Sequence, residues 1–153
     1  MLTKDLYDRD FFEWTQHNAE LLRRGCLSQA DIPHIAEEIA DMGSRDQREV
    51  RSRLEEIILH LLKWKLQPAL RYNPSGGSSW LASVNKQRSE LEGIFEQSPS
   101  LIHHGREAVA KVYARAVRSA SAETGIPKRS FPAECPFTFD QLMDAEFLPH
   151  DPA

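Results

Sequence analysis

Among the histidines that lie four residues from a glutamate, two belong to neighbouring predicted helices, a placement that can build a metal or acid/base site. His34 is followed by Glu38, and Glu56 is followed by His60. Residues four apart share one face of a helix, and imidazole and carboxylate groups that meet between helices bind metals in helical bundles. The predicted ligands of a divalent metal are therefore Glu38, Glu56, His60 and His34, with Glu37 as an alternative fourth group.

The same pairs also have a structural interpretation. A glutamate and a histidine one turn apart stabilise a helix by roughly a few tenths of a kcal/mol, and a histidine in an apolar run is usually satisfied by a hydrogen bond. The sequence contains neither the His-Glu-x-x-His pattern of zinc proteases nor the Glu-x-x-His pairs of di-iron bundles. On this interpretation the pairs support the fold and the protein uses no cofactor.

Arg88 completes the candidate functional cluster of Glu38, Glu56, His60 and Arg88. It falls on the apolar stripe of a helix predicted over 79–97, and an inward guanidinium needs a partner because a buried unpaired charge is very costly. Residues 31–42 contain four acidic and no Lys or Arg residues. The sequence therefore predicts a salt bridge from Arg88 to Glu38 or Glu37, and the alternative is an anion-binding arginine in a pocket.

A basic ridge raises the question of nucleic-acid binding. Lys111, Arg115 and Arg118 share one face of a predicted helix, and such faces can bind a phosphate backbone. No aromatic set for base stacking and no helix-turn-helix spacing accompanies the ridge. The whole chain is acidic, with 19 Lys and Arg against 23 Asp and Glu. These observations argue against nucleic acid as a partner.

The elements that must position these residues are helices, because apolar residues recur with the helical period along almost the whole chain. Expected helix ends stand at Gly25, Gly43, Pro68 and Gly125. The predicted helices span residues 5–24, 31–42, 44–67, 79–97 and 99–123. About two thirds of the chain is then helical, twice the usual fraction. The predicted fold class is all-α, a single domain over 1–153 built as an up-and-down bundle of about five helices.

The turn at Gly43-Ser44 is central to the metal hypothesis. If the helices over 31–42 and 44–67 pack antiparallel across it, the two Glu/His pairs converge between them. The apolar stripe of the shorter helix consists of Ile32, Ile35, Ile39 and Met42. If His60 is instead sealed in the core and Glu38 is engaged by Arg88, the hypothesis fails.

Two segments outside the long helices have unusual compositions. Residues 126–153 hold five of the nine prolines and four phenylalanines, which predicts a proline-rich arm that packs on the bundle, with one short helix over about 139–143. The Asn-Pro-Ser-Gly-Gly-Ser segment at 73–78 predicts a flexible surface loop. Its glycines are not a phosphate-binding loop, because the Gly-Lys-Ser/Thr ending is missing.

The cysteines and the hydropathy indicate where the protein works. Cys26 and Cys135 lie far apart and form no Cys-x-x-Cys motif, which argues against a zinc knuckle or a thioredoxin-like centre. The longest apolar run is the short segment 57–62, so neither a signal peptide nor a membrane span is expected. We expect a cytoplasmic protein without a membrane partner.

Several residues taken together form a pattern that resembles a known family. They are Asp10-Phe11 with Trp14, Glu37-Glu38-Ile39, Arg53-Leu54, His60-Leu61-Leu62-Lys63-Trp64, Trp80, Arg88 with Leu91, and Cys135-Pro136. With these residues the chain resembles the bacterial family called Domain of Unknown Function 29, over about residues 7–149. The resemblance implies an α-helical cytoplasmic protein and supplies no reaction, substrate or catalytic residue.

The sequence favours a non-enzymatic interaction module. No catalytic pattern is complete, whereas aromatic residues near both ends exceed what a small bundle needs. Such a module would bind a protein partner or itself through an apolar patch on the first helix or the C-terminal phenylalanines. The alternative is a metal-dependent or acid/base enzyme that uses the Glu/His cluster between the second and third helices.

Overall fold

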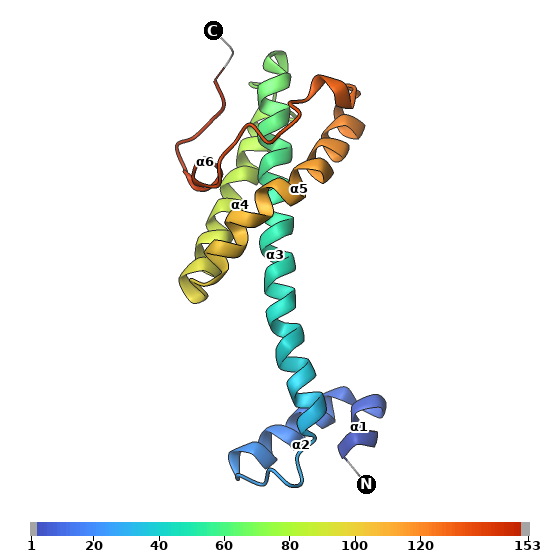
Figure 1. Cartoon of the computed structure of the whole chain (residues 1–153). Coiled ribbons are helices and arrows are strands. Elements are labelled where there is room, and N and C mark those ends of the chain that lie inside the picture. Colours follow the sequence, from blue (N-terminus) through green and yellow to red (C-terminus); the bar gives the residue numbers. More distant parts are fainter. Residues whose placement is uncertain (1–2, 151–153) are drawn as a thin grey trace. The chain divides into compact units, whose positions relative to one another are not determined.

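The computed structural model describes residues 3–150, with side chains from Asp5 onward, and this part of the chain is α-helical without a strand (Figure 1). The predicted all-α class is confirmed. The elements in this range are α1 (Thr3–Arg9), α2 (Phe11–Arg23), α3 (Ile32–Leu66), a 3-10 turn (Pro68–Leu70), α4 (Gly77–Gln97), α5 (Leu101–Thr124), a second 3-10 turn (Lys128–Ser130) and α6 (Phe139–Met143). No described helix is both long and apolar enough to cross a membrane.

The chain divides into two compact units. Residues 1–45 form the N-terminal unit and residues 46–153 form the C-terminal unit. The boundary falls within α3, so this helix contributes its first turns to one unit and the remainder to the other.

The helix predicted over 5–24 is two helices, α1 and α2. The break occurs at Asp10, which leaves the helical conformation and accepts a hydrogen bond on its side chain from the Glu13 backbone N–H at 3.0 Å. Aspartate is among the best residues for this N-cap role. The end of α2 is as predicted, because Gly25 adopts a left-handed φ of 73° and its N–H, with that of Cys26, bonds to the last carbonyls of the helix.

The predicted helix break at Gly43 is wrong, because α3 continues without interruption from Ile32 to Leu66. A single glycine inside a helix costs only about 1 kcal/mol relative to alanine, and Gly43 does not adopt the positive φ of a helix end. All side chains over 39–48 are exposed, so no packing contact requires a turn here. The helices predicted over 31–42 and 44–67 are therefore one helix and do not pack against each other.

Three helices form the core of the C-terminal unit. α3 has one buried face from Val50 onward and is buried on nearly all sides between Ile57 and Leu62, and α4 and α5 pack against it (Figure 1). The observed bounds of α4 and α5 lie within two residues of the predicted ranges 79–97 and 99–123, which confirms both helices. The apolar residues that these two helices add to the core include Val84, Leu91, Phe95, Val112, Ala116 and Ala120.

The proline-rich arm packs on the bundle as predicted. Its four phenylalanines are buried or partly buried against the core. The short helix expected over 139–143 is α6, which begins with a capping box between Thr138 and Gln141. The arm is therefore part of the folded C-terminal unit.

Most of the glycine-rich segment at 73–78 is exposed, as the predicted surface loop requires, but its two glycines are packed at the start of α4. Gly76 and Gly77 are buried, and a Cβ at Gly77 would overlap the backbone of Arg71. Only glycine permits this close approach of two backbone segments. The composition thus reflects packing at the start of α4.

Candidate functional site

Glu38, a predicted metal ligand, lies in the N-terminal unit and has a protein partner. Its Oε1 atom accepts a hydrogen bond of 2.6 Å from the Tyr7 hydroxyl. This bond and the nearby carboxylates raise the pKa of Tyr7 to about 12. Glu38 is thus the acceptor that fixes α1 on α3.

His34, its predicted neighbour, belongs to a separate hydrogen-bond network. Its Nδ1 atom lies 2.7 Å from Asp31 Oδ2, and the indole N–H of Trp14 donates to the same oxygen at 3.0 Å. Burial raises the pKa of Asp31, but the hydrogen bonds from His34 and Trp14 outweigh it and hold the pKa below its ordinary value. The Tyr7 ring stacks on the His34 ring at 3.8 Å between centroids.

Asn18 completes this network between α2 and the start of α3. Its side-chain oxygen accepts the backbone N–H of Asp31 at 2.8 Å, and its amide group donates to the Trp14 carbonyl at 3.0 Å. Both Asn18 and Asp31 are buried. The polar groups at the centre of the N-terminal unit therefore satisfy one another, which is a structural role.

Glu56 and His60 lie in the C-terminal unit and form the local pair that their spacing predicts, with 3.3 Å between Oε2 and Nε2. Only 15% of the His60 side chain is exposed, and its Nδ1 atom is buried without a hydrogen-bond partner. Burial lowers the pKa of His60, although the Glu56 carboxylate opposes the shift. His60 is thus largely sealed in the core.

The four predicted ligands do not come together as one metal site. Because α3 has no turn at Gly43, its two Glu/His pairs lie along a single helix instead of on two facing helices, and they belong to different units. Within the described residues there is no group of three or more His, Cys, Asp or Glu that could hold a metal ion. The enzyme alternative is therefore not favoured.

Arg88 is buried as predicted, but the predicted partner is wrong. Its Nε atom donates to the Leu142 carbonyl at 2.7 Å, and its Nη2 atom donates to the carbonyls of Phe147 at 3.1 Å and Gln141 at 3.3 Å. Burial lowers the pKa of Arg88, while the negative charge of Asp144 opposes this shift. The guanidinium faces the arm, so its contacts are backbone oxygens and not Glu37 or Glu38.

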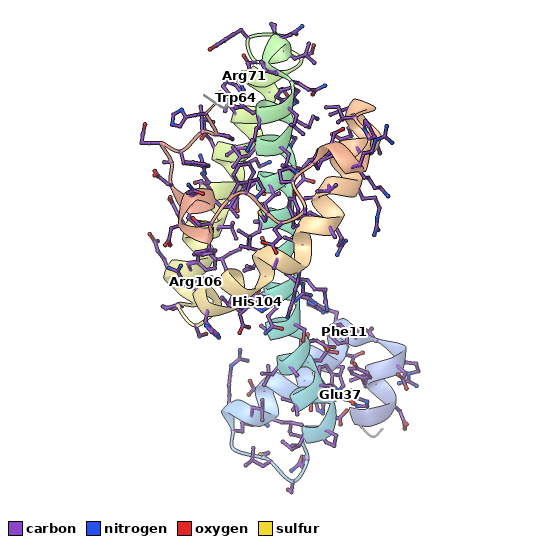
Figure 2. All side chains as sticks on the ribbon, turned by 45° about the horizontal axis from the view of Figure 1, so that its top comes forward. Phe11, Glu37, Trp64, Arg71, His104 and Arg106 are labelled. Atoms are coloured by element: carbon purple, nitrogen blue, oxygen red, sulfur yellow. The ribbon has the colours of Figure 1, made fainter. Side chains whose placement is uncertain are left out.

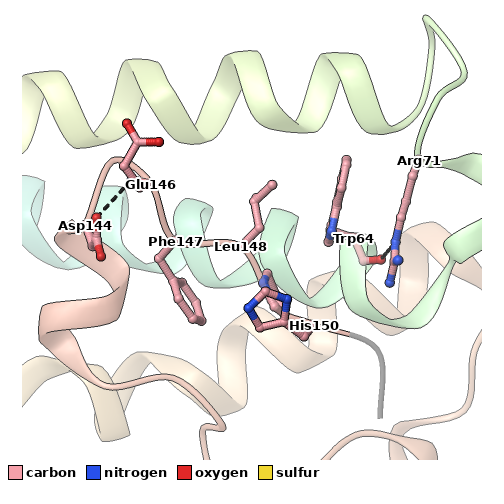
Figure 3. Close-up of a pocket in the computed structure, with 8 residues that line it drawn as sticks. Trp64, Arg71, Asp144, Glu146, Phe147, Leu148 and His150 are labelled. Atoms are coloured by element: carbon pink, nitrogen blue, oxygen red, sulfur yellow. Dashed lines mark hydrogen bonds between the residues drawn. The ribbon is translucent and has the colours of Figure 1, made fainter. Parts of the chain in front are cut away.

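A pocket of about 500 Å³ lies between the arm and the end of α3, and Figure 3 shows the residues that line it. Arg71 donates to the Trp64 carbonyl at 2.8 Å and lies over its indole ring at 5.3 Å from the centroid. Asp144 and Glu146 line the other part of this pocket. It contains no nucleophile paired with a base, so the arrangement indicates no reaction.

An apolar groove between α2 and the first turns of α3 is the most distinctive surface of the N-terminal unit. It holds about 340 Å³, and Glu38 is its only ionisable lining residue. Three of its apolar side chains are well exposed, Leu22 by 41%, Ile39 by 64% and Met42 by 61%. Its other lining residues are Trp14, Thr15, Asn18, Ala19 and Ile35.

The family model described as Domain of unknown function DUF29 matches residues 6–148, nearly the whole chain. The chain belongs to this family. The sequence resemblance to it is thereby confirmed. No curated protein and no solved structure matches the chain. Because DUF29 has no assigned function, the function of this chain must be inferred from its own geometry.

Sequence reasoning missed the groove, although a signal for it was present. Ile32, Ile35, Ile39 and Met42 form the apolar stripe that the sequence predicts for the shorter helix. In this DUF29 chain Ile32 is 45% exposed, and Ile39 and Met42 are exposed further. The signal for the groove was this apolar stripe over 32–42, because the sequence predicts no second long helix nearby that could cover it.

Proposed function

We propose that this protein is a non-enzymatic interaction module whose N-terminal unit binds a second copy of itself through the groove between α2 and α3. The observation that carries the proposal is that this groove is almost wholly apolar and open, with Leu22, Ile39 and Met42 exposed in it. A contiguous exposed apolar surface of this kind is typical of an interaction site.

The distribution of exposed apolar residues supports the same conclusion. Of the nine large hydrophobic residues that are exposed in the described chain, seven lie in the N-terminal unit. This unit contains less than a third of the chain, so chance exposure would not concentrate them there. The seven residues are Phe11, Phe12, Leu22, Leu27, Ile32, Ile39 and Met42; Figure 2 labels Phe11 on this unit.

The small core of the N-terminal unit supports a second copy of this chain as the partner that fills the groove. Trp14 and Leu21 are its only buried apolar residues in the described range. Units of about 40 residues usually need disulfides, metals or oligomerisation for stability, and the only cysteine in this unit, Cys26, is unpaired. Association of two such units would supply the apolar burial that one unit lacks.

The spacing of the apolar residues suits a symmetric contact between helices. Along α2 the groove face follows Thr15, Asn18 and Leu22, and along α3 it follows Ile35, Ile39 and Met42. Spacings of three and four residues form the apolar seam of helical bundles. Two copies related by a two-fold axis would place α2 and α3 of each copy in one four-helix arrangement.

The test is the oligomeric state of the full chain, measured by analytical ultracentrifugation across a range of concentrations. Ile39→Glu places a charge in the groove, and Ala40→Glu places the same charge on the same helix, at an exposed residue outside the groove. We expect the native chain and Ala40→Glu to be dimers and Ile39→Glu to be a monomer of unchanged helical content. A native chain that stays monomeric at high concentration, or a dimer that Ile39→Glu leaves intact, would overturn the proposal.

The compartment and the source of the protein also belong to this proposal. We propose that it acts in the cytoplasm of a bacterium. The two cysteines are unpaired, which suits a reducing compartment, and the bacterial source rests on the family resemblance. Neither a membrane nor a nucleic acid is its proposed partner.

A further inference from the structure

A pocket at the end of α5 differs in its charge from the pockets next to Trp64 and next to Arg106. It holds about 470 Å³ and lies between α5, the turn Lys128–Ser130 and the following residues of the arm; Figure 1 shows the chain turning back there from α5 into the arm. Arg118, Lys128 and Arg129 line it, and no carboxylate does. The pockets next to Trp64 and next to Arg106 differ, because in each of them a basic side chain is accompanied by at least one acidic side chain.

The three cations of this pocket are not neutralised by the protein. Within the described residues, none of Arg118, Lys128 and Arg129 has a side-chain hydrogen bond or an ion pair. The one acidic residue over 108–133 is Glu123, and Lys63 already binds it at 2.7 Å. Three uncompensated positive charges around one cavity attract an anion.

Hydrogen bonds hold the walls of the pocket in place before any ligand binds. The Tyr113 hydroxyl donates to the Pro132 carbonyl at 2.6 Å, and the Ser121 hydroxyl donates to the Ile126 carbonyl at 2.7 Å. Burial raises the pKa of Tyr113 to about 12, so its hydroxyl keeps the proton that it donates. These bonds fix the chain on both sides of the turn that carries Lys128, and a preformed site loses little entropy on binding.

The remaining lining of the pocket is apolar. Val117 and Phe131 contribute to it with Ala114, Pro132 and Ala133, and Phe131 is itself buried in the core. The volume falls within the range of small-molecule sites, which combine an apolar lining with a few charged groups. The ligand that fits this combination has a strongly anionic group and an apolar body.

We propose that this pocket binds a phosphate monoester, with the phosphate on Arg118, Lys128 and Arg129 and the apolar body against Val117 and Phe131. A phosphate dianion can engage several cations at once, and arginine binds its oxygens in a bidentate manner. The ligand is either a soluble phosphate ester or the phosphate headgroup of a lipid, since both present the same chemistry. The site lies in the C-terminal unit and does not depend on the proposed self-association.

The probe for the test is phenyl phosphate, titrated into the ¹⁵N-labelled full chain and followed by NMR. We expect binding at pH 7.5 with a dissociation constant on the order of a millimolar, with shifts centred on residues 114–133, and weaker binding of inorganic phosphate, which lacks the apolar body. Binding should weaken at pH 5, because the second phosphate pKa is about 6 and the ligand becomes a monoanion.

Arg118→Gln and Lys128→Gln should each weaken binding about three- to tenfold. Lys111→Gln removes the same charge from an exposed site on α5 outside the pocket and should leave the affinity unchanged. The absence of shifts in the pocket, equal affinity for inorganic phosphate, or an equal loss in Lys111→Gln would overturn the proposal. Co-sedimentation with vesicles containing phosphatidate, against neutral vesicles, then distinguishes a lipid headgroup from a soluble ester.

Discussion

The two units of this chain bury different kinds of side chain. Of 23 buried hydrophobic residues in the described range, 21 lie in the C-terminal unit and only Trp14 and Leu21 lie in the N-terminal unit. The centre of the N-terminal unit is instead polar, with Asn18 and Asp31 joined to Trp14 by hydrogen bonds. One unit is thus stabilised by its own apolar core, whereas the other carries its apolar surface outside, where a partner can cover it.

The largest expected effect on the free energy of unfolding comes from a variant that creates a cavity in the C-terminal core. Leu61 has no exposed surface, so Leu61→Ala should lower the free energy of unfolding by about 2–5 kcal/mol. Urea denaturation followed by circular dichroism measures the loss. Leu27→Ala removes the same atoms from an exposed site in the N-terminal unit and should change the free energy by less than about 0.5 kcal/mol. Similar losses in the two variants would show that the units do not differ in this way.

A smaller effect concerns the response of the two units to acid. Burial lowers the pKa of His60 from its ordinary value of 6.5, so the unfolded chain binds a proton that the folded C-terminal unit does not. The resulting stability is complete above pH 6.5 and is lost as the pH falls through the folded pKa. The pKa of Asp31 in the N-terminal unit is lowered from 3.8, so its contribution is lost only below that pH.

Urea denaturation at pH 7.5, 6.0 and 5.0 measures this response. The native chain should lose stability between pH 7.5 and pH 5.0, and His60→Leu should lose less over the same range. His103→Leu is the matched control, because 81% of that side chain is exposed, and it should behave as the native chain does. If His60→Leu and the native chain follow one pH profile, burial of His60 does not set the acid response.

The smallest expected effect concerns Gly43, in the exposed part of α3 near residue 45, where the N-terminal unit ends. A Cβ at Gly43 meets no atom within 4 Å, and the helix is continuous there, so Gly43→Ala should stabilise it by about 0.5–1 kcal/mol. Slower hydrogen exchange of the amides over 39–48 measures the gain. Gly125→Ala is the opposite control, because Gly125 has a φ of 76° and alanine is strained in that conformation. Faster exchange in Gly43→Ala would indicate a break at this glycine.

Helix ends with local chemical causes were predictable from the sequence. Gly25 and Gly125 end α2 and α5 with a positive φ, as their positions indicated, and α6 begins where a short helix was expected. Gly43 is also a glycine at an expected helix end, but no packing contact requires a turn there, since the side chains around it are exposed. Whether a glycine ends a helix therefore depends on tertiary packing, which the sequence pattern does not reveal.

The candidate site was predictable only where its contacts are local. The pair of Glu56 and His60 follows from helical spacing. His34 was assigned to Glu38 four residues later, but it bonds to Asp31 three residues earlier, and Glu38 accepts a hydrogen bond from Tyr7 instead. The partners of Arg88 are backbone carbonyls, which every residue carries, so no side-chain pattern identifies them.

The attachment of the arm by Arg88 has a consequence for the order in which the chain folds. The carbonyls that receive this guanidinium belong to residues 53 to 59 positions later in the chain. During synthesis, which adds about 5–20 residues per second, α3, α4 and α5 are complete before these acceptors exist. Until then we expect Arg88 to stay hydrated, since burial of an unpaired cation costs a large free energy. We therefore expect the apolar core around Arg88 to close fully only after residue 147 has left the ribosome, and we expect a chain that stops before α6 to leave this part of the core open to water.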